Sequence, residues 1–403
     1  MFQVLMPDSQ SFHCVQYLQR MDEGDGGVVR FLLNFCNDLA NYGHRVTLVT
    51  EDDRDVPASW TDGSKQNRSV VKLQLPGLPW SRLSPECEQA MVSVFRDADI
   101  LHIHGMWDPR NLVLARFARK IHVPYVFSVH GMLNDWALNL KPWKKKLYLA
   151  IAGRTLLGRA EQIHCTAEGE RMQMLKQLPR DNTTVIPLNF DREGFENLPG
   201  PERARQKFSA LQTNQLVVMV LGRLHPVKRI ELLIDAVALV HAAGVAVQLV
   251  VAGPPEEKRY LANLQALVSR HGLQEDVHFV GAVGGLDKVS LYQACDIFIL
   301  PSWQECFGMV LAEALAAETP VITTRCVDTW PELKSAGGLI VHDTPANVAG
   351  AIVELAGDDQ RRSKLGRRGR QFVFDWLDPA RVIVQFDQFY RHAIDGFKQA
   401  GQK

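Results

Sequence analysis

Short apolar runs of strand type alternate with helical segments along almost the whole chain. In the first half the expected strands read FQVLM, RVTLVT, SVVKLQL, DILHIHG, PYVFSVHG, QIHCTA and TTVIPL. Segments with helical periodicity, such as residues 27–43 and 111–121, separate most of them. This alternation is typical of βαβ units, in which a crossover segment joins two parallel strands. The sequence therefore predicts parallel sheets covered by helices.

Residues 189–208 interrupt the alternation with Pro199, Gly200, Pro201 and a cluster of charges, which indicates a linker. Strand-type runs then resume, and they read LVVMVLGRL, VQLVVAG, VHFVGAV, DIFILPS and PVITT. A chain of 403 residues suits two domains of roughly 150–200 residues each. The predicted fold class is α/β, with two Rossmann-like doubly wound domains facing a cleft. We expect them over residues 1–195 and 196–380, with a C-terminal helix over 381–403 that packs back across both.

Composition excludes several classes of protein. Hydrophobic residues make up 46% of the chain and charged residues 22%, as in a folded globular protein. Lys and Arg number 45, as do Asp and Glu, so nucleic acid is not an expected partner. The seven scattered cysteines contain no CxxC pair, which favours buried thiols in a reducing cytosol over a metal site. No apolar stretch approaches about 20 residues, so we expect a soluble cytoplasmic protein without a signal peptide.

The most informative motif is PSWQECFGMVLAEALAAETPVITT, which follows the strand-type run DIFIL. Glu305 is expected in the loop before a helix and Glu313 inside that helix. On one helix their Cα atoms would lie about 12 Å apart, too far for two carboxylates acting on one bond. We therefore expect them to hold two parts of one elongated ligand, such as sugar hydroxyls. Gly308 would let an anion or hydroxyl approach the start of the helix. The alternative is a pair of ordinary surface glutamates.

A second motif, VLGRLHPVKRIELLIDAV, opens the C-terminal domain. Arg223 and Lys228 follow the end of its strand and precede a helix. A guanidinium and an ammonium group in this position can clamp a diphosphate without a metal. The alternative is two solvated cations on a loop. Since the glutamates follow another strand of the same domain, the four side chains can converge at one edge of the sheet.

The N-terminal domain offers weaker signals. Gly26 and Gly27 open a helix in GDGGVVRF, a pattern that is equally consistent with a structural turn. His130, in SVHGM, ends a strand at the edge where parallel sheets bind ligands. A lone histidine is more often structural, so both interpretations stay open.

Taken together, these motifs resemble the family 4 glycosyltransferases of GT-B fold. The resemblance rests on the strand end GR followed by a lysine, the strand ending PS, and the paired glutamates before PVI. It implies that Arg223 and Lys228 hold a donor diphosphate, that Glu313 bonds ribose hydroxyls, and that Glu305 bonds the transferred sugar. It also implies main-chain contacts at Phe307, Gly308 and Met309, a position for His130 near the sugar ring, and closure of Gly26 and Gly27 over the phosphates. The side chains that the resemblance implies for catalysis are His130, Glu305, Arg223 and Lys228.

The first half is similar more narrowly to bacterial transferases of exopolysaccharide, capsule or lipopolysaccharide assembly. The phrases HIHGMWDPRNLVLARFARK, PYVFSVHGMLNDWALNLKPWKKKLYLA and RAEQIHCTAEGE carry this similarity. The predicted activity is a retaining, metal-independent transfer of a hexose from a UDP- or GDP-linked sugar to a glycan or lipid-linked glycan, with no cofactor. The alternatives are a nucleotide-sugar epimerase on the same architecture and a non-catalytic glycan-binding protein.

Three segments depart from the family pattern or admit two interpretations. Glu318 stands where the family often has glycine, and CVDTWPEL replaces a glycine pair before a glutamate. The segment PDSQSFHCVQYLQRMDEGD is expected to be a long loop that serves the acceptor. Residues 141–160, KPWKKKLYLAIAGRTLLGRA, could rest on the anionic inner membrane surface, making the protein peripheral there. The favoured alternative for this segment is a core-packed helix with a solvated basic entrance.

Overall fold

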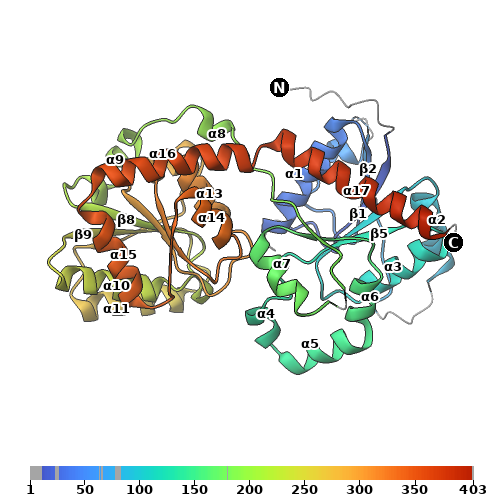
Figure 1. Ribbon diagram of the computed structural model, residues 1–403, viewed down its shortest axis with the longest axis horizontal. Helices are drawn as coiled ribbons and strands as arrows, with labels where there is room; N and C mark the ends of the chain where they lie inside the picture. The colour runs from blue at the N-terminus through green and yellow to red at the C-terminus, as the bar shows by residue number, and fades with distance from the viewer. Residues whose placement is uncertain are drawn as a thin grey trace. The chain divides into compact units, whose positions relative to one another are not determined.

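The computed structural model describes residues 11–22, 27–62, 64, 67–77, 83–178 and 180–401. It forms two compact units (Figure 1). Unit 1 comprises Met1–Asn189 and Leu377–Lys403, and unit 2 comprises Phe190–Trp376. These borders differ by a few residues from those expected at 195 and 380. Within the described residues, no helix is long and apolar enough to cross a membrane.

Unit 1 contains a seven-stranded parallel sheet in the order β3-β2-β1-β4-β5-β6-β7. Its strands are β1 (His13–Tyr17), β2 (Arg45–Thr50), β3 (Arg68–Lys72), β4 (Ile100–His104), β5 (Tyr125–Ser128), β6 (Ile163–Cys165) and β7 (Thr183–Val185). The strand order reverses direction between β1 and β4, so this pair marks the topological switch point of the sheet.

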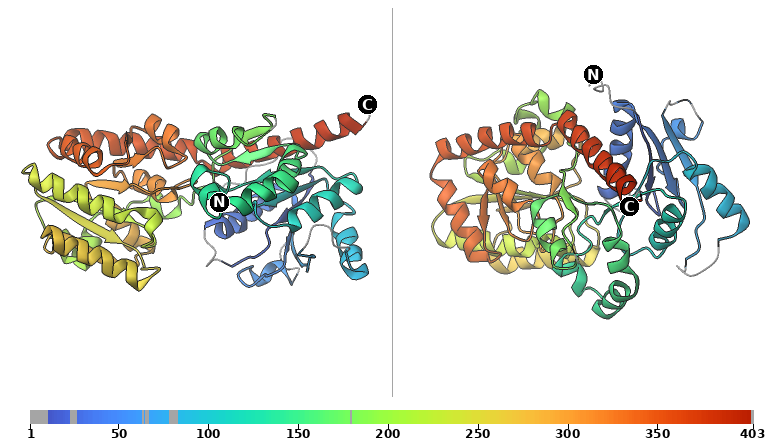
Figure 2. Two further views of the ribbon diagram at one scale, coloured as in Figure 1. Left: turned by 90° about the horizontal axis from the view of Figure 1, so that it is seen from below. Right: turned by 45° about the vertical axis from the view of Figure 1, so that its right-hand side comes forward.

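Helices connect these strands and cover the sheet (Figure 2). They are α1 (Gly27–Tyr42), α2 (Pro85–Phe95), α3 (Arg110–Lys120), α4 (Asp135–Asn139), α5 (Pro142–Tyr148), α6 (Arg154–Gly158) and α7 (Glu168–Leu175), with the short turns η2 (Ala58–Trp60) and η3 (Leu149–Gly153). The helix α1 is strongly amphipathic, and it buries Phe31, Leu32, Phe35 and Leu39 on one side. This burial of a single apolar stripe explains why the segment is helical.

The first strand described in unit 1 is β1, at His13–Tyr17, in a segment whose sequence predicts a loop. The expected strand FQVLM lies outside the described residues. The segment expected to be a long loop instead contains β1, and all five residues of HCVQY are buried. The polar residues His13 and Gln16 interrupt the apolar run by which a buried strand is recognised in a sequence. They can be buried because each has hydrogen-bond partners, such as Thr47 for His13 and Tyr390 for Gln16.

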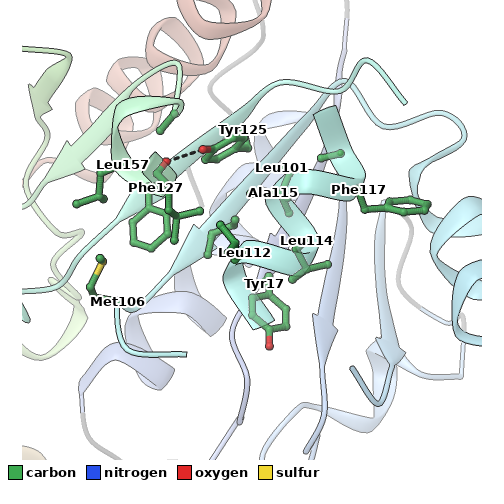
Figure 3. Close-up of a cluster of buried hydrophobic side chains, with 14 of the residues drawn as sticks. Tyr17, Leu101, Met106, Leu112, Leu114, Ala115, Phe117, Tyr125, Phe127 and Leu157 are labelled. Atoms are coloured by element: carbon green, nitrogen blue, oxygen red, sulfur yellow. Dashed lines mark hydrogen bonds between the residues drawn. The ribbon is translucent and has the colours of Figure 1, made fainter. Parts of the chain in front are cut away.

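One core of unit 1 packs α3 and neighbouring segments against the sheet (Figure 3). Tyr17, Leu101 and Phe127 point from the strands into this cluster, and Leu112 and Leu114 meet them from α3. The hydroxyl of Tyr125 donates a hydrogen bond of 2.5 Å to the backbone carbonyl of Leu156. Burial of this apolar surface is the main stabilising contribution to the unit.

The last helix, α17 (Pro379–Gly401), is the one expected to run back across both domains. Its buried side chains belong to the second core of unit 1, where Phe386 and Tyr390 pack with Phe35 of α1. Unit 1 is therefore built from two segments that are distant in the sequence, and β1 contacts Tyr390 of α17 through Gln16.

Unit 2 contains a six-stranded parallel sheet in the order β10-β9-β8-β11-β12-β13. Its strands are β8 (Leu216–Leu221), β9 (Val247–Ala252), β10 (Val277–Gly281), β11 (Ile297–Leu300), β12 (Val321–Thr324) and β13 (Leu339–Val341). Its helices and turns are α8 (Glu193–Glu196), α9 (Glu202–Lys207), η4 (Ser209–Leu211), η5 (Pro226–Lys228), α10 (Ile230–Ala242), α11 (Lys258–His271), α12 (Gly285–Gln293), α13 (Met309–Ala316), α14 (Trp330–Ala336), α15 (Pro345–Ala356) and α16 (Asp359–Trp376). This is the doubly wound arrangement expected, with the switch point between β8 and β11.

The prediction of a linker at residues 189–208 is wrong for most of that range. It contains α8 and α9, which pack against α12 within unit 2. Phe195 and Ala204 are buried, and Arg203 and Lys207 both pair with Asp287 of α12. The Pro-Gly-Pro sequence forms the turn between the two short helices and does not separate domains. The charges that suggested a linker instead attach these helices to the unit.

Candidate active site

The sequence motifs of unit 2 meet at its switch point. Arg223 and Lys228 follow the carboxyl end of β8, and Glu305 follows that of β11. These two strands are neighbours in the sheet, with Phe298 opposite Met219. Open α/β sheets bind ligands in the crevice outside the carboxyl ends of the strands at this point. The arrangement therefore brings the motif residues to the position where a ligand site is expected.

Lys228 and Glu305 form an ion pair across the switch point. The ammonium group of Lys228 donates to Oε2 of Glu305, and the side chains are 17% and 24% exposed. The backbone N–H of Trp303 donates to the carbonyl of Val227 over 2.8 Å, which joins the loops after β8 and β11. Since the pair is largely shielded from water, its attraction is stronger than that of a surface ion pair.

The backbone of Glu305 is fixed from the neighbouring strand. Its N–H donates to the carbonyl of Cys326 over 3.2 Å, and its carbonyl accepts from the N–H of Asp328 over 2.8 Å. These bonds form an isolated parallel bridge between Glu305 and Val327, after β12. The loop that carries Glu305 is therefore held by the segment that follows β12, which suits a side chain that must present a fixed geometry to a ligand.

Gly308 directly precedes α13 and has the left-handed φ of 71°. A Cβ atom at this position would lie 3.3 Å from Cγ of Glu305 and 3.1 Å from Cδ1 of Leu311. Both the backbone conformation and the close approach explain why glycine stands here. Phe307 is buried and stacks on Trp376 with ring centroids 5.3 Å apart, and Met309 is the first residue of α13. The free N–H groups of the helix start thus lie beside Glu305.

Glu313 has a different environment from Glu305. Its Oε1 accepts from Lys288 over 2.7 Å and its Oε2 from the hydroxyl of Tyr292 over 2.9 Å. Both partners belong to α12, and the Glu313 side chain is 14% exposed. Burial, with the nearby Glu313 charge, raises the pKa of Tyr292 well above its ordinary value. Each carboxylate oxygen keeps a further lone pair, so Glu313 can still accept from a ligand.

Arg223 is less closely associated with the other motif residues. Its side chain is 61% exposed and pairs with Glu256 over 2.8 Å. The structure therefore joins Lys228 and Glu305 directly, with Gly308 beside them, and leaves Arg223 on the rim. An exposed guanidinium with a single surface partner can exchange that partner for a ligand anion at low cost.

The candidate residues of unit 1 lie at the carboxyl end of its sheet. His130 follows β5, is half-buried, and has the left-handed φ of 55°. The N–H of the next residue, Gly131, donates to the buried carboxylate of Glu170 over 2.6 Å, which fixes this loop. Burial lowers the pKa of His130 to about 3. Gly27 is the exposed first residue of α1, whereas Gly26 lies outside the described residues.

A polar cluster at the switch point of unit 1 was not anticipated from the sequence. The hydroxyl of Tyr17, at the end of β1, donates to Asp108 over 2.8 Å. Arg110 pairs with Asp108 over 3.1 Å and with Glu51 over 2.7 Å. Each of these residues lies at or after the carboxyl end of β1, β2 or β4. That position is the feature of the sequence from which the cluster could be predicted. The Lys288 and Tyr292 partners of Glu313 were also missed, since they depend on how α12 packs.

Large apolar side chains are exposed over residues 136–151, a region that we call the 136–151 face and that includes α5 and parts of α4 and η3. Figure 1 labels α4 and α5 in unit 1. None of the seven residues of α5, all of them described, is buried. The large exposed apolar side chains recur at intervals of three or four residues, and they are Trp136, Leu140, Trp143, Leu147 and Ile151. Lys141, Lys144 and Lys146 are exposed among them. The core-packed interpretation holds for Leu156 and Leu157 of α6, which are buried, and the exposed lysines agree with its solvated basic entrance. It does not account for the exposed Trp143 and Leu147 of α5.

Comparisons with known proteins cover both units. A family model described as "Glycosyl transferases group 1" matches residues 202–372, and one described as "Glycosyl transferase 4-like domain" matches residues 26–189. The chain is 25% identical over 350 residues to a GDP-mannose-dependent alpha-(1-6)-phosphatidylinositol dimannoside mannosyltransferase of Mycobacterium tuberculosis, covering 85% of this chain and 87% of the relative. It is also 25% identical over 420 residues to a D-inositol 3-phosphate glycosyltransferase of Stackebrandtia nassauensis, covering 96% and 92%.

A solved structure supports the same architecture. The fold resembles that of Anabaena HepE in complex with UDP and glucose, with a TM-score of 0.71 over 93% of this chain and 98% of the other. At 19% sequence identity this likeness shows the fold alone.

Proposed function

The chain belongs to the family 4 glycosyltransferases of GT-B fold, and from this premise we propose that it is a retaining, metal-independent hexosyltransferase. As a glycosyltransferase it takes a sugar from a nucleotide-sugar donor. The proposed donor is UDP- or GDP-linked, and the proposed acceptor is a glycan or lipid-linked glycan in cell-surface polysaccharide synthesis. One relative is a GDP-mannose-dependent mannosyltransferase, which supports this class of donor.

The observation that carries the proposal is the Lys228–Glu305 ion pair at the switch point between β8 and β11. A diphosphate placed there would meet the ammonium group of Lys228 and the free N–H groups at the start of α13. Arg223 would complete the clamp from the rim. Phe307, Gly308 and Met309 would offer main-chain contacts to the diphosphate and the sugar, because Gly308 has no side chain in the way.

The two glutamates would hold the two ends of the donor. Glu305 would accept hydrogen bonds from hydroxyls of the transferred sugar, and Glu313 would accept them from the ribose. In the proposed reaction the bond from the anomeric carbon to the diphosphate breaks, and the acceptor oxygen bonds to the same face of the sugar. The departing phosphate oxygen takes the acceptor's proton, while Lys228 and Arg223 stabilise its charge. No carboxylate acts as a covalent nucleophile.

The candidate residues of unit 1 complete the proposal. His130 would lie near the sugar ring, and Gly26 and Gly27 would close over the phosphates, as the family resemblance implies. An epimerase or a non-catalytic glycan-binding protein has no specific support, since both family models describe glycosyl transferases.

We also propose that the 136–151 face contacts an anionic membrane surface, where a lipid-linked acceptor would be found. Trp143 is 66% exposed and Ile151 68%, although both are large and apolar. Exposed lysines surround them, so the face combines apolar burial with attraction to anionic headgroups. A peripheral position at the inner membrane follows from this proposal.

Turnover tests the proposed function directly. The protein is incubated with UDP-, GDP- and ADP-linked hexoses and with candidate acceptors, and released nucleoside diphosphate is measured. We expect release with one nucleotide class, unchanged by a metal chelator, and a product with the donor's anomeric configuration. Inversion would contradict retention, and a rearranged sugar still attached to its nucleotide would favour the epimerase. Absence of binding and turnover with every donor would contradict the proposed function.

A further inference from the structure

A chain of hydrogen bonds crosses the sheet of unit 1, and its first half has a fixed direction. The backbone carbonyl of Ile186 can only accept, so Nε2 of His164, 2.7 Å away, must carry a hydrogen. In a neutral imidazole the other nitrogen then accepts, and Nδ1 of His164 takes the hydroxyl hydrogen of Ser128 over 2.7 Å. Because that hydroxyl has one hydrogen, its oxygen must accept from Nε2 of His102, also at 2.7 Å.

The second half of the chain continues in the same direction. Nδ1 of His102 is left as an acceptor, and it takes the hydroxyl hydrogen of Tyr390 over 2.6 Å. The Tyr390 oxygen accepts from Nε2 of Gln16 over 2.9 Å, which turns the Gln16 carbonyl oxygen toward His104. This oxygen lies 2.7 Å from Nε2 of His104 and can only accept. His104 therefore carries its hydrogen on Nε2 and accepts through Nδ1.

The chain ends at His130. Nδ1 of His104 lies 2.9 Å from Nε2 of His130, and the two rings are stacked with centroids 5.2 Å apart. Since His104 accepts here, His130 must donate through Nε2, and its Nδ1 keeps a lone pair. Among the described residues, Nδ1 of His130 has no hydrogen-bond partner. His130 is half-buried at the carboxyl end of β5, so this nitrogen is the part of the ring left for a ligand.

Burial keeps the four histidine rings neutral. Burial lowers the pKa of His164 to about 4 and that of His130 to about 3. It lowers the pKa values of His102 and His104 well below the ordinary value, and the neighbouring histidines act in the same direction. All four rings are therefore uncharged near neutral pH, and each has one donor and one acceptor nitrogen.

We propose that His104 is a positioning residue that holds His130 in the Nε2–H tautomer and so presents Nδ1 of His130 as an acceptor for a sugar hydroxyl. The inference rests on the proposed function in taking the ligand to be a sugar. A hydroxyl can donate to this nitrogen, whereas an ionised carboxylate cannot. The direction is set by the Ile186 carbonyl and relayed by Tyr390 of α17, which is 288 residues from His102 in sequence.

Nuclear magnetic resonance of the full chain with ¹⁵N-labelled histidine tests the tautomer without any substrate. The His130 signals are identified by their loss in His130→Asn. We expect the Nε2–H tautomer in the wild type. His104→Asn should keep it, because the Asn side-chain oxygen can replace Nδ1 as the acceptor. His104→Leu should give a mixture of both tautomers. Tyr390→Phe, which removes one oxygen atom, should also give a mixture and serves if His104→Leu fails to fold.

Steady-state rates provide the functional arm. We expect kcat/KM for a hexose donor to fall on the order of 3- to 10-fold in His104→Leu, and to recover in His104→Asn. Two results would overturn the inference even if the protein is an active transferase. One is an Nδ1–H tautomer of His130 in the wild type. The other is an Nε2–H tautomer that stays unchanged in both His104→Leu and Tyr390→Phe. Conversely, a protein that shows the expected tautomers but turns over no nucleotide sugar would contradict the proposed function alone.

Discussion

Glu305 and Glu313 lie eight residues apart in the sequence but have different partners in the structure. Glu305 pairs with Lys228 at the switch point, whereas Glu313 is held by Lys288 and Tyr292 of α12. Glu305 therefore belongs to the loop that would meet the diphosphate and sugar, and Glu313 to a rigid helix pair. This difference agrees with separate roles for the two carboxylates.

The two roles predict different effects of removing each charge. Glu313→Gln should weaken free nucleoside diphosphate and every donor that shares its nucleotide, because the lost contact is with the ribose. Glu305→Gln should not weaken diphosphate binding, because it removes the carboxylate that competes for Lys228, and it should lower turnover, since its proposed contact is with the transferred sugar. Each loss should be on the order of 10- to 100-fold. Calorimetry and steady-state rates measure the two effects, and equal losses of diphosphate affinity would contradict the division.

Glu318, one of the departures from the family pattern, has the left-handed φ of 67°. A side chain in this conformation costs roughly 1–2 kcal/mol, and the ion pair of Glu318 with Arg370, at 3.8 Å, offsets little of it. Glu318→Gly should therefore raise the stability of unit 2 by up to about 1 kcal/mol. Thermal unfolding measures this, with Glu318→Ala as the control that keeps Cβ and should gain nothing. A gain in Glu318→Ala equal to that in Glu318→Gly would show that the backbone is not the cause.

Some residues could be located from the sequence and others could not. Lys228, Glu305 and Gly308 follow strand ends in a recognisable pattern, and the structure brings them together. The partners of Glu313 could not be predicted, because they depend on the packing of α12 against α13. The hydrogen-bonded histidine chain could not be predicted either, because its contacts depend on how the strands pair. Its members still share one feature of the sequence, since each lies in or just after a strand: His102, His104, His130 and His164.

At the scale of elements, strand prediction worked where the apolar pattern was uninterrupted. The runs containing β2, β8, β9 and β11 were all expected as strands. The sequence around β1 predicts a loop because His13 and Gln16 interrupt the apolar pattern. The partners that allow their burial come from distant parts of the chain. The segment of α8 and α9 resembles a linker in sequence because a Pro-Gly-Pro turn joins the two helices. Local sequence does not show that a charged segment is held by Asp287 of α12.

The 136–151 face gives a prediction at the same scale. The double variant Trp143→Ser, Leu147→Ser should reduce binding to vesicles containing anionic lipid by at least about tenfold, because two apolar side chains no longer enter the interface. Co-sedimentation with vesicles measures the binding, which should also weaken as salt rises. The matched control is Leu239→Ser, Val353→Ser, which alters exposed apolar residues of unit 2.

The outcome can also exclude the membrane proposal. Unchanged vesicle binding in the double variant of α5 would contradict it. The proposal would also be contradicted if the wild-type protein does not bind vesicles and instead self-associates through this face. A change from dimer to monomer in the double variant would show such self-association.

At the scale of the whole molecule, the chain forms two units with separate sheets. Unit 1 combines the N-terminal half of the chain with α17, which packs in its second core. The aromatic residues Phe386 and Tyr390 of α17 are fully buried beside Phe35 of α1. The periodicity of the last helix was visible in the sequence, but its partners were not, since they lie hundreds of residues away.

The buried histidines predict that unit 1 becomes less stable in acid. His102, His104, His130 and His164 have pKa values below the ordinary 6.5 in the folded protein. As the pH falls below 6.5 the unfolded chain takes up protons that the folded chain does not, so stability falls toward pH 4 and is fully present above 6.5. Each histidine contributes up to about 1.4 kcal/mol per pH unit.

Calorimetric unfolding at a series of pH values measures this effect. The slope of stability against pH should decrease in His104→Asn, which removes one of the four groups. A transition of unit 1 that does not move between pH 7 and pH 5 would contradict neutral burial of these rings.

The central claim is that the switch point of unit 2 binds the diphosphate of a nucleotide sugar through Lys228. The most direct measurement is calorimetric titration of the free nucleoside diphosphate into the wild type, Lys228→Met and the control Lys364→Met, whose lysine is exposed on α16. Loss of a charged hydrogen bond should weaken binding on the order of 10- to 100-fold in Lys228→Met and leave Lys364→Met unchanged. Equal affinity of the diphosphate for the wild type and Lys228→Met would contradict the claim.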